Sequence, residues 1–453
     1  MGPCTIAGTR LPWRALPELA PHEAALMSWR NKLTPRRLRQ LWYAPLLLLA
    51  MALMMLRVLV LARLLDVPDF AQLSLGLLVS STFGMLGCLG LQSLLQRDMP
   101  ILIVRGRITS ALVLLLQSAL VAYGCAAVAG LAVAATALPG WVPMAVGVLG
   151  IVHGLSQQLF LLVSTESRSH GEPLRFSMQS LVRASLVFGL GTMAAMVTGS
   201  ALAVLAIEAV ASLVLAHGLL ARIFRRAERS LVACAMIARQ RLTRINWVSA
   251  LTFLAVSMVG FVLVSADRWA ASWLLDTAGF AHYAFAAILL TVAMSLQSLV
   301  NSSVYPLLAR LYARAGRHAA FLLSLRLSLA LLTVGLLSSI PLYYLLDAAI
   351  VRWYPAYDPT REILGLLLVV AVLRLADFGS SYLLITGFER QLLRINTLTV
   401  LLVSTAWLAW LRPWQGQPPT LQDLAVLALL LSLTTYAVVA ATSWRHRKPE
   451  ISS

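Results

Sequence analysis

Charged residues are scarce in this chain, where they make up 12% of 453 residues. Soluble globular domains usually contain about 25%. Hydrophobic residues make up 60%, and the mean hydropathy is +0.82. A soluble enzyme of this length is excluded, because too few polar side chains are available to cover its surface. The composition instead predicts an all-α polytopic membrane protein.

Acidic residues and cysteines are both few. The chain has 18 Asp plus Glu against 36 Lys plus Arg, a formal net charge of +18. In a soluble protein this surplus would suggest nucleic acid, but cytoplasmic loops of membrane proteins are themselves rich in Lys and Arg. We therefore expect no nucleic-acid partner. The cysteines form no close pair, so neither a zinc site nor a disulfide framework is predicted; they are Cys4, Cys88, Cys125 and Cys234.

Catalytic motifs are also missing from the sequence. Its seven histidines are scattered, and it has neither a phosphate-binding Gly-Lys loop nor a nucleotide-binding domain. We therefore expect no enzyme activity, no cofactor, no metal and no ATP binding by this chain.

Long apolar runs, by contrast, are abundant. A helix that crosses a bilayer needs about 20 mostly apolar residues, and we count twelve such runs. They lie at about 43–65, 72–95, 108–132, 141–163, 178–198, 201–222, 246–266, 280–305, 322–346, 363–385, 393–411 and 423–443.

The placement of Arg and Lys supports this count. If the N-terminus is cytoplasmic and the loops alternate, 27 of the 36 basic residues fall in cytoplasmic segments. Only Arg268, Arg352, Arg361 and Arg412 then fall in outside loops. If one span fewer were counted, every later loop would move to the other side of the membrane, and this bias would be lost. We therefore predict a bacterial inner-membrane protein with both termini in the cytoplasm.

The spans divide the chain into two halves of six. We expect a basic cytoplasmic leader at 1–42, too long and polar for a signal peptide. The remaining predicted parts are an N-terminal bundle at 43–222, a cytoplasmic linker at 223–245, a C-terminal bundle at 246–444 and a cytoplasmic tail at 445–453.

A short internal repeat links the two halves. The segments 64–71 and 274–281 share five of eight residues at an offset of 210. Leu and Ala are abundant enough to match by chance, but Asp and Phe also coincide. Both segments are predicted outside turns that enter the second span of a half. Internal repeats are common in transporters, so we expect Asp66 and Asp276 to occupy equivalent places.

The same segments carry a family resemblance. Arg63-Leu64-Leu65 with Pro68, Asp69 and Phe70 resembles the first outer loop of the polysaccharide exporters, or O-antigen flippases, of the multidrug/oligosaccharidyl-lipid/polysaccharide (MATE-like) superfamily. The family's signature between spans seven and eight is resembled by Asp267-Arg268 followed by Gly279-Phe280-Ala281-His282-Tyr283-Ala284. The family's usual end of span eight is resembled by the segment that begins at Pro306. The sequence departs from the family pattern at Ala71, where Gly is usual, and at Ala281-His282, where a Gly-Leu-like pair is usual.

The resemblance implies two helical bundles around a central cavity, which move lipid-linked sugars by alternating access. It implies a flippase for undecaprenyl-diphosphate-linked oligosaccharide in polysaccharide or lipopolysaccharide assembly. The expected partners are that lipid-linked oligosaccharide, membrane lipid and the polysaccharide polymerase machinery. One alternative is a secondary exporter of small molecules. Another is a membrane polysaccharide polymerase or ligase, although the longest outside loop, about 347–362, is short for a catalytic site.

Ionisable residues inside the predicted spans are the candidate substrate-binding residues, because a charge at membrane depth is costly and rarely faces lipid. Most of them also have a structural interpretation. Arginines near a span end could extend to the membrane interface, and Arg374 and Asp377 could pair with each other at i, i+3. Glu208 could be neutral or could pair with an arginine from another span. The candidates are Arg57, Arg183, Glu208, Arg326, Arg374 and Asp377.

The excess of arginine over acid in these spans favours an anionic cargo. Guanidinium groups bind phosphate through two parallel hydrogen bonds and stay protonated when buried. Arg57 lies well inside the first span and has no acid within one turn of its own helix. We therefore expect Arg57 to face a central, water-accessible space between the halves, with Arg374 across from it.

Overall fold

The computed structural model describes residues 42–136, 142–411 and 419–447, and within these ranges all regular secondary structure is helical. In the described part of the chain, twelve helices are long and apolar enough to cross a membrane, which confirms the predicted class of polytopic all-α protein. The predicted leader up to residue 41, Arg412 and the end of the predicted tail from residue 448 lie outside the described residues.

The helices fall into two groups separated by a short linker. The N-terminal half contains α3 (Tyr43–Leu64), α4 (Val67–Leu86), α5 (Leu91–Val104), α6 (Ile108–Thr136), α7 (Met144–Ser169), α8 (Pro173–Thr198) and α9 (Ala201–Arg226). The linker contains α10 (Leu231–Gln240) and η1 (Leu242–Arg244). The C-terminal half contains α11 (Trp247–Leu274), α12 (Thr277–Ala286), α13 (Ile288–Trp353), η2 (Pro355–Thr360), α14 (Arg361–Leu375), α15 (Gly379–Ile385), α16 (Glu389–Leu411) and α17 (Leu421–Arg445).

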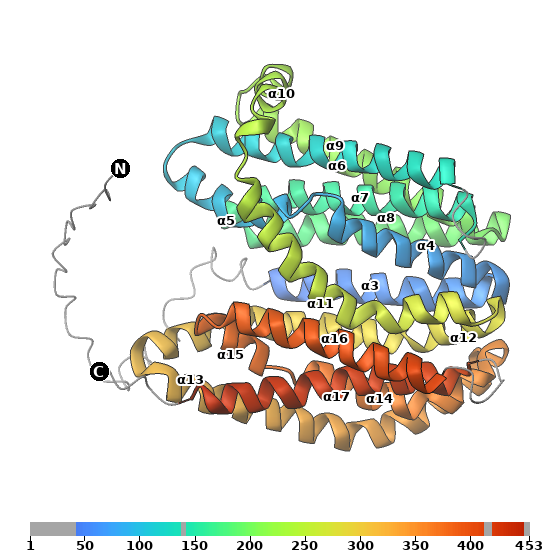
Figure 1. Cartoon of the computed structure of the whole chain (residues 1–453). Coiled ribbons are helices and arrows are strands. Elements are labelled where there is room, and N and C mark those ends of the chain that lie inside the picture. The colour runs from blue at the N-terminus through green and yellow to red at the C-terminus, as the bar shows by residue number, and fades with distance from the viewer. Residues whose placement is uncertain (1–41, 137–141, 412–418, 448–453) are drawn as a thin grey trace.

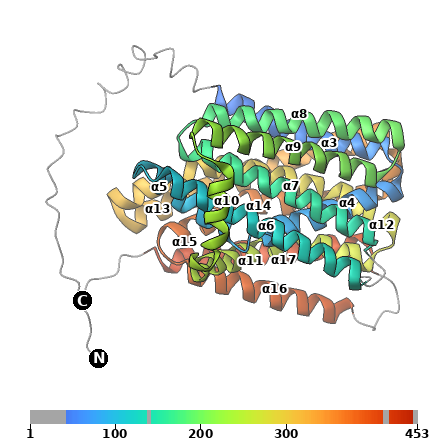
Figure 2. The same cartoon turned by 90° about the horizontal axis from the view of Figure 1, so that it is seen from above.

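The two halves pack side by side with most of their long helices roughly parallel. Figure 1 shows α4 and α6–α9 in its upper part, α13–α17 in its lower part, and α3 and α11 between them. In Figure 2, α8 lies along one edge of the molecule and α16 along the opposite edge. We call the end that carries the α3–α4 and α11–α12 turns the Asp66 side. The opposite end, where α9 finishes, is the Arg226 side.

The repeated segments have the same backbone geometry. Leu65 and Leu275 end their helices at φ/ψ of −94°/148° and −92°/156°. Asp66 and Asp276 begin the next helices at −66°/157° and −65°/171°, the extended conformation usual for a helix N-cap. The helices that follow, α4 and α12, pack against each other across the two halves. The local equivalence expected from the repeat is therefore present.

The turn between spans five and six is confirmed, whereas span two is shorter than predicted. Gly199 ends α8 at a φ of 63°, which keeps α8 and α9 separate. The run predicted at 72–95 breaks after α4, and Gly90 adopts a φ of 81° before α5 begins. A Cβ atom at Gly90 would overlap the carbonyl oxygen of Ala250. Only glycine combines this positive φ with such close contact to α11.

Span seven is longer than predicted. Its expected end was residue 266, but α11 continues through an apolar stretch to Leu274. Asp267 and Arg268 were expected at the outer surface and in an outside loop, respectively. Both instead lie inside α11, about two turns before its end. The prediction for their position was therefore wrong.

One further predicted span contains a break. The run at 363–385 is divided into α14 and α15, and Asp377 lies between them. Its carboxylate accepts hydrogen bonds from the backbone N–H of Ser380 at 3.2 Å and from its hydroxyl at 2.6 Å. In α13, Gly316 is non-helical at φ 78°, so this element consists of two helical arms, which meet between the runs predicted at 280–305 and 322–346.

Candidate functional site

A cavity of about 260 Å³ lies between the two halves. It is lined by α3, α4 and α7 on one side and by α11, α12 and α13 on the other. Arg57 from α3 and Arg268 from α11 are its charged residues, and its lining, within the described part of the chain, includes no Asp or Glu. Other lining polar residues are Ser74, Ser81, Gln157 and Thr291. The charged side chains of its described lining are therefore both basic.

Arg57 lines this cavity but is also held by an acid. Its Nη1 donates to Oε2 of Glu208 on α9 at 2.8 Å, and the two side chains are only 4% and 0% exposed. His153 Nε2 lies 3.3 Å from the same carboxylate oxygen, and Ser80 Oγ lies 2.8 Å from His153 Nδ1. Arg57 Nε has no hydrogen-bond partner. Glu208 therefore offsets much of the charge that Arg57 presents.

Glu208 fits beside Arg57 because a neighbouring helix leaves room for it. A Cβ atom at Gly191 of α8 would overlap Oε1 of Glu208. Pairing of Glu208 with an arginine from another span was one of the two expectations for this residue, and it is confirmed.

Arg268 lines the same cavity as Arg57, and it was not among the candidate residues from the sequence. Its Nη2 donates to the carbonyl oxygen of Ala287 at 3.2 Å and to the hydroxyl of Thr291 at 3.1 Å, and its Nε has no partner. These hydrogen-bond partners are neutral, and the acid within electrostatic range of Arg268 is the buried Asp267. The apolar run that continues to Leu274 was the signal that could have placed Arg268 inside the span.

Arg374 lies elsewhere, in a cavity of about 160 Å³ within the C-terminal half. Its Nε donates to Ser432 Oγ and its Nη1 to the carbonyl oxygen of Val264, both at 3.1 Å. Its Nη2 is 3.9 Å from Asp267 Oδ1. The expectation that Arg374 lies across from Arg57 was therefore wrong. Its pairing with Asp377 is also absent, because α14 ends at Leu375 and Asp377 caps α15.

Two of the motif residues meet in the core of the C-terminal half. The hydroxyl of Tyr283 donates to Oδ2 of Asp267 at 2.7 Å, and both side chains are fully buried. Arg63 is exposed at the end of α3. The side chain of Pro306 lies outside the described residues.

Tyr283→Phe is expected to destabilise the protein by about 1–3 kcal/mol, because it leaves a buried carboxylate oxygen without its donor. Tyr357→Phe is the matched control, since Tyr357 is equally buried and its hydroxyl has no partner. Unfolding in detergent, followed by circular dichroism, measures the difference. Equal stability of the two variants would show that the Tyr283–Asp267 hydrogen bond contributes little.

The remaining two candidate arginines differ in their surroundings. Arg183 on α8 places its guanidinium carbon 4.9 Å from the ring centre of Phe160, within electrostatic range of Arg57 and Glu208. Arg326 on α13 is exposed. The structure thus brings Arg183 close to the Arg57–Glu208 pair and leaves Arg326 apart from it.

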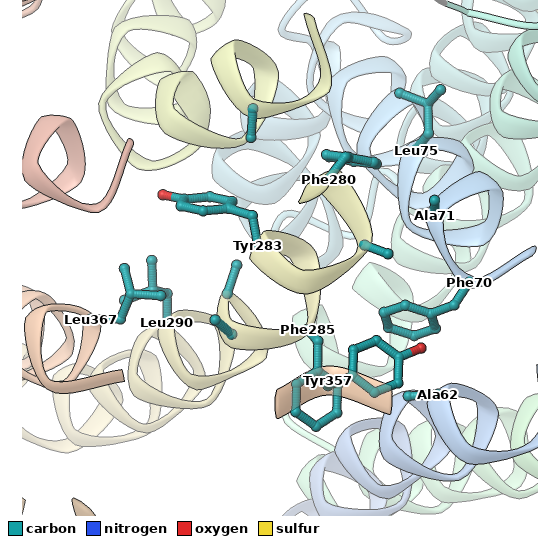
Figure 3. Close-up of a cluster of buried hydrophobic side chains, with 14 of the residues drawn as sticks. Ala62, Phe70, Ala71, Leu75, Phe280, Tyr283, Phe285, Leu290, Tyr357 and Leu367 are labelled. Atoms are coloured by element: carbon teal, nitrogen blue, oxygen red, sulfur yellow. The ribbon is translucent and has the colours of Figure 1, made fainter. Parts of the chain in front are cut away.

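Three aromatic side chains join the two halves on the Asp66 side of the central cavity. Phe70 of α4 lies 5.4 Å from Tyr357 of η2, and Phe285 of α12 stacks on Tyr357 at 4.4 Å between ring centres. Figure 3 shows the three rings grouped between helices of both halves. We call Phe70, Phe285 and Tyr357 the aromatic seal. Phe70 lies one turn of α4 before Ser74, which lines the cavity, so the three rings lie between the cavity and the Asp66 side.

Comparison with known proteins identifies the fold. No family model and no curated protein matches the sequence. Among solved structures, the chain is similar to the inward-facing conformation of a multidrug resistance MATE family transporter of the MOP superfamily. The TM-score is 0.58 and the identity 12%, covering 88% of this chain and 98% of that one.

Two other solved structures show the same similarity at 12% identity, each covering 89% of this chain and 94% of its own. One is MATE in complex with Br-NRF, with a TM-score of 0.53. The other is the outward-facing conformation of a multidrug resistance MATE family transporter of the MOP superfamily, with a TM-score of 0.52. This chain is therefore a multi-pass membrane protein with the two-lobe helical fold of the MATE transporters.

Proposed function

We propose that this chain is a flippase for polysaccharide or lipopolysaccharide assembly. Its cargo is an oligosaccharide that is linked through a diphosphate to a polyprenyl chain, and it moves this cargo across the inner membrane by alternating access. The observation that carries the proposal is the central cavity, which Arg57 and Arg268 both line and whose described lining has no acid. A diphosphate group is strongly anionic, and guanidinium groups bind phosphate oxygens with good geometry. The cavity therefore suits an anionic head group.

The orientation follows from the basic residues. Arg222, Arg225, Arg226 and Arg229 gather where α9 ends and the linker begins. Cytoplasmic loops attract such residues, so we assign the Arg226 side to the cytoplasm. The aromatic seal then lies on the outer side, and the cavity belongs to an inward-facing state. The higher TM-score with the inward-facing transporter supports this assignment.

A reporter that is active only in the cytoplasm is expected to work when fused after Arg229. The same reporter fused after Asp358, in η2, is expected to be inactive, because that turn belongs to the Asp66 side. Enzymatic activity in intact cells measures both fusions. Activity after Asp358 would reverse the proposed orientation.

The transport proposal is tested in cells that carry or lack this chain. Without it, the lipid-linked oligosaccharide should accumulate and remain protected from a sugar-cleaving enzyme that cannot cross the inner membrane. Restoring the chain should make the oligosaccharide accessible from outside. Unchanged accessibility in the two strains would reject the flippase function.

A secondary exporter of small molecules is the other function that the fold allows, because the similar structures include multidrug resistance transporters. An exporter of organic cations needs acidic side chains toward its cargo, whereas the described lining of this cavity carries only basic ones. Increased resistance to cationic drugs on expression, with no effect on the lipid-linked oligosaccharide, would favour this alternative.

A further inference from the structure

A second large cavity lies on the outside of the N-terminal half. This groove, of about 710 Å³, runs between α8 and α9, which Figure 2 places at the edge of the molecule. Val182 and Leu186 of α8 and Val210 and Val214 of α9 line it and are 38–67% exposed. Arg222 is its one charged lining residue. The groove is therefore apolar along its length and basic at its end on the Arg226 side.

The length of the groove can be compared with the thickness of a membrane. Its lining on α9 extends from Ala206 to Arg222, which corresponds to about 24 Å at 1.5 Å per residue. Half of a bilayer's hydrocarbon core is about 15 Å. The groove therefore runs from the membrane surface at Arg222 past the middle of the bilayer, in the direction along which lipid chains lie.

The charge at the end of the groove is available to a ligand. Arg226 is bound to Glu172 at 3.0 Å, whereas Arg222 and Arg225 form no hydrogen bond or ion pair with the described residues and are exposed. Basic side chains at a membrane surface attract anionic lipid. The groove shares no lining residue with the central cavity, so it is a separate site.

We propose that this groove binds one acyl chain of an anionic phospholipid from the leaflet on the Arg226 side, with the lipid phosphate at Arg222. The apolar lining accommodates the chain, and the guanidinium selects the negative head group. This site is independent of the transported cargo. It makes a resident lipid part of the surface of the N-terminal half.

Gly218 offers a way to fill the groove without disturbing the fold. It lines the groove, and a Cβ atom added there would meet no other atom within 4 Å. Gly218→Leu therefore places a side chain in the space proposed for the lipid. Gly124→Leu on α6 is the matched control, because Gly124 is also exposed, helical and surrounded by open space.

The test measures lipid retained by the purified full-length protein, by native mass spectrometry after titration with phosphatidylglycerol or phosphatidylcholine. The unsubstituted protein and Gly124→Leu should each retain one phosphatidylglycerol. Gly218→Leu should lower its affinity by about tenfold, the equivalent of 1.4 kcal/mol. Arg222→Gln should remove the preference for phosphatidylglycerol over phosphatidylcholine.

Three results would overturn the proposal. Equal retention by Gly218→Leu and Gly124→Leu would mean that the lipid is not in the groove. An unchanged preference in Arg222→Gln would mean that Arg222 does not bind the head group. Displacement of phosphatidylglycerol by an equal concentration of polyprenyl phosphate would assign the groove to a polyprenyl chain.

Discussion

Arg268→Gln is expected to reduce transport of the lipid-linked oligosaccharide by about 10- to 100-fold, since a hydrogen bond to a charged group contributes about 1.5–3 kcal/mol. The stability of the protein should change little. Arg268 donates only to Ala287 and Thr291, and the Ala287 carbonyl keeps its hydrogen bonds from the backbone N–H and hydroxyl of Thr291. The substitution therefore leaves no buried charge unpaired.

Two further variants test whether the effect requires a positive charge inside the cavity, or whether the loss of any arginine has the same effect. Arg268→Lys should keep part of the activity, because it retains the charge but loses the planar fork that binds phosphate. Arg326→Gln makes the same charge change at an exposed position and should transport normally. Transport is measured as accessibility of the oligosaccharide outside the inner membrane. Normal activity of Arg268→Gln would contradict an anion-binding cavity.

Arg57→Gln is expected to destabilise the protein by about 3–5 kcal/mol, the usual cost of removing one partner of a buried ion pair. Glu208 would remain fully buried, with His153 at 3.3 Å and Arg183 within electrostatic range as its remaining neighbours. Loss of transport in this variant alone would therefore not distinguish binding from folding. Removing Arg57 therefore has a structural cost in this geometry.

The double variant Arg57→Gln/Glu208→Gln separates the two roles of Arg57. Removing both charges should restore most of the stability, while transport should remain low because the cavity has lost a guanidinium. Glu208→Gln alone should bind inorganic pyrophosphate more tightly than the unsubstituted protein, since Arg57 is released from its carboxylate. Chemical unfolding and titration calorimetry measure these effects. Normal transport by the double variant would show that Arg57 has only a structural role.

The number of spans could be predicted because each needs only a run of apolar residues, and that signal is local. The repeat was also readable, since the turns at Asp66 and Asp276 are made by eight consecutive residues. Breaks inside the spans were not readable. At Gly90 the backbone lies against the carbonyl oxygen of Ala250, 160 residues further along the chain, and a single sequence does not specify that contact.

The candidate site was predictable only in part for a similar reason. A charged residue within an apolar span stands out because placing it at membrane depth costs free energy. Arg57 and Glu208 could therefore be found as individual residues. Their pairing joins positions 151 residues apart, which a single sequence does not specify. Arg268 was missed because a span end misplaced by two turns put it outside the membrane.

The aromatic seal has an electrical consequence. It is built from two phenylalanine rings and one tyrosine whose hydroxyl has no hydrogen-bond partner. Such a layer offers an ion no group that could replace its hydration shell, and moving a bare charge through an apolar layer is costly. If the seal is the closed outer end of the proposed flippase, we expect it to block small ions as well as the proposed cargo. The inward-facing protein should then not dissipate the membrane potential.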